Sequence, residues 1–192
     1  METVRDHKTE LRRRYKDLRR QFSLGGGATA GRMVAENLRR LLADYADHQC
    51  CLYRARPTEI SCLLEPVTDY FFPLMDGEDL SFRRPLQPGA FRSGTLGIAE
   101  PVARESVALD PSLPTVVCCP AVALDRAGRR LGMGQGYYDR FFARAPHCLK
   151  VGVAFHVQFS SDPLPVESWD QPMDWIVTEK MVLRTQSPTR SS

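Results

Sequence analysis

The chain has 192 residues, 43% of them hydrophobic, and a formal net charge of +3 at pH 7. This length supports one globular domain with a sizeable core. Charged residues crowd the start of the chain, which excludes the apolar segment of a signal peptide, and no apolar run reaches the length of a membrane span. We therefore expect a cytoplasmic protein without a membrane partner.

Basic residues dominate the predicted N-terminal helix, because residues 1–20 carry eight basic and four acidic side chains. Its apolar residues recur at steps of four, three and four, which is typical of a helix that docks on a protein body. These residues are Leu11, Tyr15, Leu18 and Phe22. The charges then line a solvated face, and we expect no nucleic-acid partner. Lys8 and Arg12 lie one helical turn apart beside the apolar stripe, where both can reach a phosphate group.

Glycine, proline and apolar patterns predict the following elements. Glycines 25–27 predict a break before a second helix over 28–45, with Met33, Val34, Leu38, Leu41 and Leu42 on one face. We then expect a strand over 49–53, a short helix or turn over 60–67, a strand over 69–74 and mostly loop over 77–97, with a short strand near 80–82. Strands over 150–155 and 175–178 close the sheet, and residues 184–192 form a disordered tail.

The most informative stretch begins with a nearly continuous apolar run over 115–124, ended by Asp125. Such a run is typical of a strand buried on both faces of a parallel sheet. Three glycines at alternate positions follow, and residues 137–144 have helical spacing that ends before Pro146. The glycines are therefore expected just before a helix N-terminus, which favours an anion such as phosphate. Taken alone, they are equally consistent with a turn of unusual dihedral angles.

Charged residues flank this glycine turn. Arg129 and Arg130 precede it and form a possible phosphate clamp, and Asp139 follows it as a possible magnesium ligand. The six cysteines show no zinc-site spacing, and we expect reduced, mostly buried thiols. The four histidines are scattered along the chain, so neither a metal cluster nor a Ser-His-Asp arrangement is predicted.

The same stretch resembles the signature of the 5-formyltetrahydrofolate cyclo-ligase family. The matching residues are Pro120-Ala121-Val122-Ala123-Leu124-Asp125, then Gly128, then Arg130-Leu131-Gly132-Met133-Gly134-Gln135-Gly136-Tyr137-Tyr138-Asp139. Further matches follow the order of the family along nearly the whole chain. They are Lys8-x-x-Leu11-Arg12, Tyr53 with Glu59, residues 97–101, residues 151–155 with Gln158, and residues 164–170.

The predicted elements and the resemblance together indicate an α/β fold. We expect a single three-layer, Rossmann-like domain over residues 1–183, with a mostly parallel central sheet flanked by helices. The resemblance implies a monomeric, ATP-dependent ligase that cyclises 5-formyltetrahydrofolate to 5,10-methenyltetrahydrofolate. In that reaction the formyl oxygen is phosphorylated, and ADP and phosphate are released.

The resemblance also implies the site residues. ATP is expected to contact Lys8, Arg12, Arg130, Leu131, Gly132, Met133, Gly134, Gln135, Gly136, Tyr137 and Tyr138. The folate is expected to contact Arg54, Glu59 and Tyr137. Catalytic roles fall to Arg130 and Tyr137, and the Mg²⁺ ligands are Asp139 and Asp170.

Two other classes of protein stay open at this point. A short segment separates Glu59 from Pro73, and a reduced folate wall would favour a non-catalytic paralogue that binds nucleotide and folate. An unrelated α/β protein could use the same layout for a sugar phosphate or a coenzyme A derivative.

Overall fold

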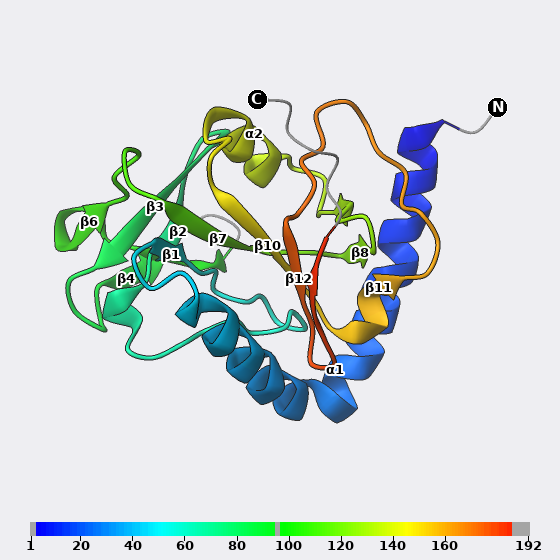
Figure 1. Ribbon diagram of the computed structural model, residues 1–192, viewed down its shortest axis with the longest axis horizontal. Helices are drawn as coiled ribbons and strands as arrows, with labels where there is room; N and C mark the ends of the chain where they lie inside the picture. Colours follow the sequence, from blue (N-terminus) through cyan, green and yellow to red (C-terminus); the bar gives the residue numbers. More distant parts are fainter. Residues whose placement is uncertain (1–2, 95–96, 186–192) are drawn as a thin grey trace.

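The computed structural model describes residues 3–94 and 97–185. Its largest sheet has five strands in the order β1-β7-β10-β12-β13 (Figure 1). These are β1 (Gln49–Cys51), β7 (Thr115–Pro120), β10 (Leu149–Val153), β12 (Trp175–Val177) and β13 (Val182–Arg184). The first four pair in parallel and β13 is antiparallel at the edge. The predicted mostly parallel sheet is confirmed, although the sequence patterns missed β13.

Alternate residues of β7 belong to two different hydrophobic clusters. Val116 and Cys118 pack with the second half of the long helix α1, whereas Val117 and Cys119 pack with helix α2. All four are fully buried. A strand with both faces covered reads as a continuous apolar run, which is why the sequence pattern was informative here. Helices cover both faces, and the three-layer, Rossmann-like classification stays a prediction.

The helix α1 (Val4–Ala43) is one continuous element of 40 residues. The two separate helices predicted from glycines 25–27 are therefore wrong, since the backbone stays helical through all three glycines. Figure 1 shows the helix changing direction between its first half, beside the sheet, and its second half, beneath it. Glycines are common at such bends because they weaken the helix without ending it.

Each half of α1 packs on a different part of the molecule. In the first half, Tyr15 joins the cluster of Val122, Ala123, Leu131 and Leu164, with Leu11 and Leu18 packed against it. In the second half, the residues that pack on the central sheet are Ala30, Val34, Leu38, Leu41 and Leu42. The predicted apolar stripes are confirmed except at Met33, which is 47% exposed.

The apolar run over 115–124 does not form one strand. After β7 the chain passes to β8 (Ala123–Asp125), which pairs with β9 (Arg130–Leu131) and β11 (Phe159–Ser160) in a second sheet. The short helix α2 (Tyr137–Arg144) then covers the residues predicted for it. The strand therefore leads into the glycine turn through a short antiparallel pair.

The segment predicted as mostly loop carries much of a third sheet. Strands β2 (Phe72–Asp76), β3 (Asp79–Pro85) and β6 (Ser106–Ala108) pair antiparallel, and β4 (Phe91–Ser93) pairs with β5 (Ala99–Pro101). The described residues also contain the 3-10 turns η1 (Val67–Asp69), η3 (Ala103–Glu105) and η4 (His156–Gln158). Within the described ranges, the segment between β1 and β2 contains η1 and no α-helix.

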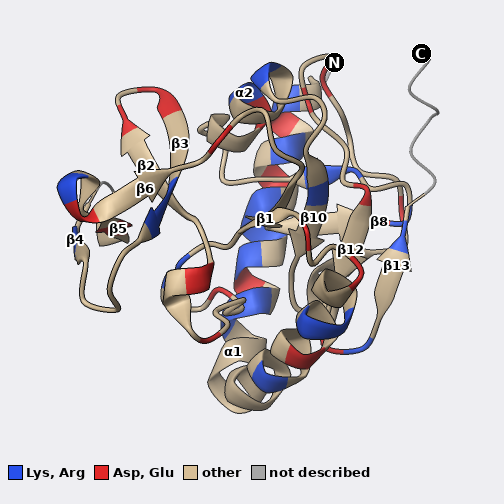
Figure 2. Ribbon diagram, turned by 60° about the vertical axis from the view of Figure 1, so that its left-hand side comes forward, with Lys and Arg blue, Asp and Glu red and all other residues tan. Residues whose placement is uncertain are grey.

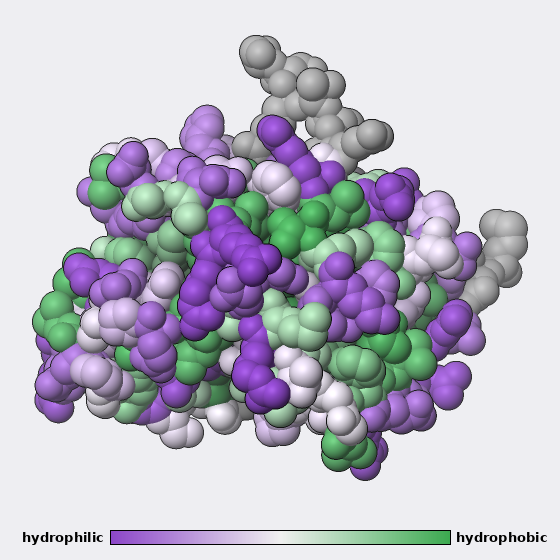
Figure 3. All heavy atoms as spheres, turned by 60° about the horizontal axis from the view of Figure 1, so that its bottom comes forward, coloured by the Kyte–Doolittle hydropathy of each residue, from purple (hydrophilic) through white to green (hydrophobic). Residues whose placement is uncertain are grey.

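Charge is concentrated on α1, where Figure 2 shows basic residues along the first half of the helix. Figure 3 views the underside of the molecule, where hydrophilic side chains gather in the middle with apolar ones on either side. The outer side of the second half of α1 is polar as well, since Arg32, Glu36, Arg39 and Arg40 are exposed. No helix in the described part of the chain is long and apolar enough to cross a bilayer.

The thiols are as predicted, whereas the first residue of the predicted C-terminal tail belongs to a strand. All six cysteines are free, and five of them are buried, as expected. The predicted tail starts at Arg184, but this residue ends β13, and Thr185 hydrogen-bonds the carbonyl oxygens of Met173 and Asp174. Residues 186–192 lie outside the described residues, so the single-domain boundary stays a prediction.

The continuity of α1 yields the first testable prediction. A Cβ atom at Gly25 would meet nothing within 4 Å, and the glycine is exposed in a helical segment. Gly25→Ala should therefore raise the free energy of unfolding by about 0.5–1 kcal/mol, measured by urea denaturation. Gly31→Ala is the matched control, because Gly31 has equally open surroundings in the same helix. A destabilised Gly25→Ala beside a stabilised Gly31→Ala would contradict a continuous helix.

Candidate active site

A cavity of about 410 Å³ opens where β1 and β7 end. Tyr53, just after β1, and Pro120, the last residue of β7, both line it. Because β1 and β7 are adjacent parallel strands, their carboxyl ends meet at the same edge of the sheet. Open α/β sheets place their ligands at this edge. The cavity therefore lies where the sequence predicted a ligand.

The glycine turn forms one wall of this cavity. Gly134 and Gly136 have φ angles of +97° and +69°, in the left-handed region that favours glycine. Gly136 is the N-cap of α2, whose first N–H groups have no partner within the helix. At Gly132 an added Cβ would lie 2.6 Å from Nη1 of Arg130. The turn therefore needs glycine for its dihedral angles and also for close packing.

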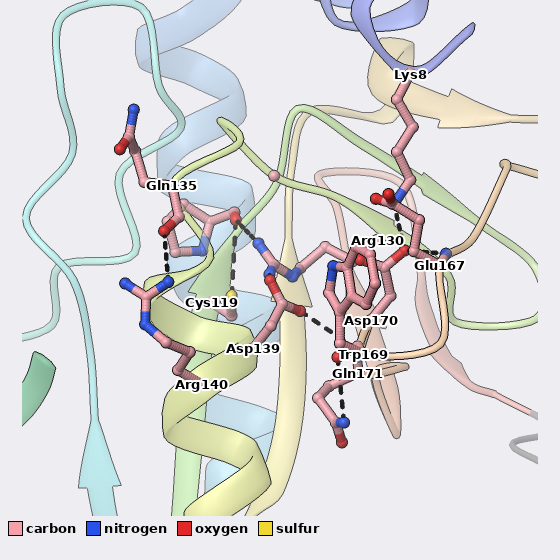
Figure 4. Close-up of polar contacts among 12 residues, drawn as sticks. Lys8, Cys119, Arg130, Gln135, Asp139, Arg140, Glu167, Trp169, Asp170 and Gln171 are labelled. Atoms are coloured by element: carbon pink, nitrogen blue, oxygen red, sulfur yellow. Dashed lines mark hydrogen bonds and ion pairs between the residues drawn. The ribbon is translucent and has the colours of Figure 1, made fainter. Parts of the chain in front are cut away.

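Arg130 and Asp139 form a buried ion pair across the glycine turn. Arg130 Nη2 donates to Asp139 Oδ2 at 2.8 Å, and the side chains are only 5% and 17% exposed (Figure 4). Burial disfavours the Arg130 charge, but the neighbouring acidic groups Cys119 and Asp139 keep the pKa of Arg130 above its ordinary value. Because burial raises the pKa of Cys119 to about 12, that thiol is neutral at pH 7. Asp139 therefore supplies the compensating charge.

The first half of α1 brings two basic side chains to the cavity. Arg12 Nε donates to the carbonyl oxygen of Gly132 at 2.9 Å, which holds the helix against the glycine turn. Lys8 is buried and its Nζ lies 2.8 Å from Glu167 Oε2, with a second ion pair to Asp170. Figure 4 shows Lys8 reaching from α1 to these two carboxylates. The positive charge beside the turn is thus held in fixed positions.

Asp139 and Asp170 both line the cavity, as the magnesium prediction requires. Asp139 accepts hydrogen bonds from Arg130 and from the Gln171 N–H, and Asp170 accepts from Lys8 and the Glu167 N–H. In residues 3–94 and 97–185, no group of three or more His, Cys, Asp or Glu side chains could hold a metal ion. Mg²⁺ is usually held by one or two carboxylates together with phosphate oxygens. The donor set fits magnesium that arrives with a phosphate ligand.

A further part of the cavity wall contains Glu59. Its Oε2 accepts a hydrogen bond from the Arg56 N–H at 2.9 Å, and its Oε1 lies 3.4 Å from Nη1 of Arg19 on α1. The preceding residue, Thr58, has a φ angle of +82°, which is unusual for a β-branched residue. The Cζ atom of Arg54 lies over the Phe91 ring, 4.4 Å from its centre. A carboxylate in a fixed loop therefore lines the same cavity as the glycine turn.

The hairpin between β2 and β3 closes the side of the cavity. Tyr137 Oη donates to the carbonyl oxygen of Gly77 at 3.1 Å. Arg140 bridges the glycine turn and the hairpin, because Nη1 donates to the Gln135 carbonyl at 2.9 Å while Nε and Nη2 donate to the Glu78 carbonyl. Apolar side chains complete the wall: Pro73, Met75, Leu80 and Ile98.

Every residue that the family resemblance implies for the site lines this one cavity. Their roles stay predictions, and both Tyr137 and Tyr138 are among the lining residues. Arg129, predicted with Arg130 as a phosphate clamp, does not line it, and its Nη1 lies 3.6 Å from Asp125 Oδ2 instead. The sequence patterns missed Glu167 and Arg140 as contacts, and they missed Arg19, which lies behind Glu59. Helical spacing contained the signal for Arg19, since Lys8, Arg12 and Arg19 are separated by four and seven residues and so share a face of α1.

A model of the 5-formyltetrahydrofolate cyclo-ligase family matches residues 4–179. The chain belongs to this family. Among curated members, it is 34% identical over 128 residues to 5-formyltetrahydrofolate cyclo-ligase of Mycolicibacterium smegmatis, a match that covers 63% of this chain and 65% of the relative. It is 44% identical over 69 residues to the Escherichia coli enzyme, over 35% of this chain and 37% of the relative.

The fold agrees with a solved structure in the cyclo-ligase family. The structure of Aquifex aeolicus 5,10-methenyltetrahydrofolate synthetase superposes with a TM-score of 0.80 and 32% sequence identity, over 96% of both chains. This similarity extends along nearly the whole chain, whereas the sequence alignments to the two curated relatives cover less than two thirds of each relative. The family assignment therefore rests on the complete fold as well as on the motifs.

The Arg130–Asp139 pair yields the second prediction. Asp139→Asn should lower the free energy of unfolding by about 2 kcal/mol, because it leaves a buried guanidinium without its counter-charge. Urea denaturation measures the change. Asp79→Asn is the matched control, since Asp79 pairs with Arg144 at the surface, where both side chains are more than half exposed. No measurable change is expected there. Equal effects of the two substitutions would contradict a special role for the buried pair.

Proposed function

We propose that this protein converts 5-formyltetrahydrofolate to 5,10-methenyltetrahydrofolate and consumes ATP, which leaves as ADP and phosphate. The observation that carries the proposal is that one cavity gathers a glycine turn at a helix N-terminus, the basic residues Lys8, Arg12 and Arg130, and the carboxylate Glu59. A phosphate chain fits the first set, and a ligand with N–H donors fits the last. Membership of the cyclo-ligase family supports the same substrates.

The chemistry needs activation of an unreactive formamide. The formyl oxygen on N5 attacks the γ-phosphorus of ATP, so the bond from that phosphorus to the bridging oxygen breaks and ADP leaves. N10 then attacks the activated formyl carbon and loses its proton, and the carbon–oxygen bond breaks to release phosphate. Phosphoryl transfer of this kind asks the protein mainly to align the reactants and to neutralise charge.

In this proposal each wall of the cavity performs one part of the task. The amides of residues 132–137 and the Arg12 side chain hold the phosphate chain beside α2. Arg130, fixed by Asp139, stabilises the charge on the transferring phosphoryl group. Tyr137 contacts the folate between the two ends of the cavity. Glu59 and Arg54 bind the folate at the far end, where the apolar hairpin residues line the wall.

The proposal includes a magnesium ion held by Asp139 and Asp170. When bound with ATP, the ion would offset the negative charge of the phosphate oxygens. Asp170 presents only Oδ2 to Lys8 and to the Glu167 N–H, so the remaining oxygen is suited to a further ligand. For Asp139, both oxygens already accept hydrogen bonds, from Arg130 and from Gln171. Binding of the ion therefore requires these contacts to rearrange.

The direct test mixes the protein, Mg-ATP and 5-formyltetrahydrofolate and follows the near-ultraviolet absorbance of the methenyl product. Absorbance should rise only when all three are present, and ADP should form in equal amount. Reactions that lack ATP or lack Mg²⁺ are the controls. Binding of both ligands without any rise in absorbance would contradict the proposal and would favour the non-catalytic paralogue.

A second test separates the nucleotide end of the cavity from the folate end. Arg12→Ala should raise the KM for ATP about ten-fold, because a charged hydrogen-bond donor is lost at the glycine turn, and should leave the KM for the folate nearly unchanged. Arg13→Ala is the matched control, since Arg13 is exposed and does not line the cavity. Equal effects of Arg12→Ala on both KM values would contradict the assignment of this end to ATP.

A further inference from the structure

Arg19 is a buried cation that the proposed reaction does not use directly. It is 7% exposed and does not line the cavity. Its Nη1 lies 3.4 Å from Glu59 Oε1, and Glu59 does line the cavity. In the described part of the chain, the buried Nε of Arg19 has no hydrogen-bond partner. Arg19 thus lies behind the carboxylate, on the side away from any ligand.

The Arg19–Glu59 ion pair is expected to contribute little to the stability of the fold. In a buried ion pair, the attraction between the charges exceeds the cost of removing them from water only when the geometry is good and the remaining donors have hydrogen-bond partners. Here the contact from Arg19 Nη1 to Glu59 Oε1 is long, at 3.4 Å, and among the described residues the buried Nε donor has no acceptor. An apolar residue at position 19 would continue the packing of Tyr15 and Leu18 without that cost. Stability of the fold therefore does not explain why a buried arginine occupies position 19.

Two contacts hold the Glu59 carboxylate, one on each oxygen. The Arg19 guanidinium lies beside Oε1, and the Arg56 N–H donates to Oε2. The preceding residue, Thr58, has a left-handed backbone conformation. Each carboxylate oxygen can accept two hydrogen bonds, so each has one position left for a ligand. A group with two neighbouring N–H donors would match both oxygens at once.

We propose that Arg19 is a positioning residue, which fixes the Glu59 carboxylate for two-point recognition of the N–H edge of the folate ring. This inference rests on the proposed function, which supplies the folate. Because Lys8, Arg12 and Arg19 share a face of α1, one helix serves both ends of the cavity. At 1.5 Å per residue, Lys8 and Arg19 lie about 16 Å apart along the axis, far enough to serve two ligands.

A double-mutant cycle tests this role by equilibrium binding. Calorimetry measures the Kd of 5-formyltetrahydrofolate without ATP for the wild type, Arg19→Met, Glu59→Gln and the double variant. Arg19→Met should weaken folate binding about ten-fold, and the same change in the Glu59→Gln background should weaken it less than about two-fold. The Kd of Mg-ATP should stay unchanged throughout. Arg20→Met is the matched control on the exposed side of α1 and should behave as the wild type.

Several results would overturn the inference. The inference would be contradicted if Arg19→Met bound the folate with wild-type affinity, or if it raised the Kd of the folate by the same factor in the wild-type and Glu59→Gln backgrounds. An equal loss of Mg-ATP affinity would also contradict it. If Arg19→Met does not fold, Arg19→Lys enters the same cycle and should give a smaller, still Glu59-dependent loss. Folate binding without turnover in the wild type would defeat the proposed function alone, whereas a wild type that does not bind the folate would defeat both.

Discussion

The fold and the candidate site depend on one constraint, which is that α1 stays helical from Val4 to Ala43. Its second half packs on the central sheet and anchors the helix. Its first half is thereby held over the second sheet, where Tyr15 packs with Leu131, the residue just before the glycine turn. Lys8 and Arg12 then reach the cavity, and Arg19 reaches Glu59 behind its wall, all from the same helix. A true break at the glycines would remove that anchor.

Buried ion pairs hold the charged side chains around the cavity in fixed positions. Lys8 pairs with Glu167 and Asp170, Arg130 with Asp139, and Arg19 with Glu59. Each cation comes from one segment and its partner from another, so these pairs tie α1, the glycine turn, α2 and the loop of Glu59 together. Buried pairs contribute little net stability, but they restrict where a charge can lie. The pairs thereby fix the positions of charge in the cavity, which the proposed alignment of phosphate and folate would need.

The sequence predicted the parts of the molecule that depend on local patterns. The extent of α2, the buried strand β7 and many of the residues that line the cavity follow from apolar spacing, the glycine run and the family motifs. The errors arose where tertiary packing overrides a local signal. Glycines 25–27 favour a break, yet packing on both sides of the bend keeps α1 helical. Likewise, the apolar residues 121–124 gave no sign that the chain leaves the central sheet for a second one.

In the proposed reaction, the formyl oxygen receives the phosphoryl group in this cavity. The most direct measurement follows that atom, using 5-formyltetrahydrofolate labelled with ¹⁸O in the formyl group and turned over with Mg-ATP. Mass spectrometry of the released inorganic phosphate should find a single labelled oxygen in each phosphate, because the carbon–oxygen bond breaks when N10 closes the ring. Unlabelled phosphate, with the label recovered in water, would contradict the account.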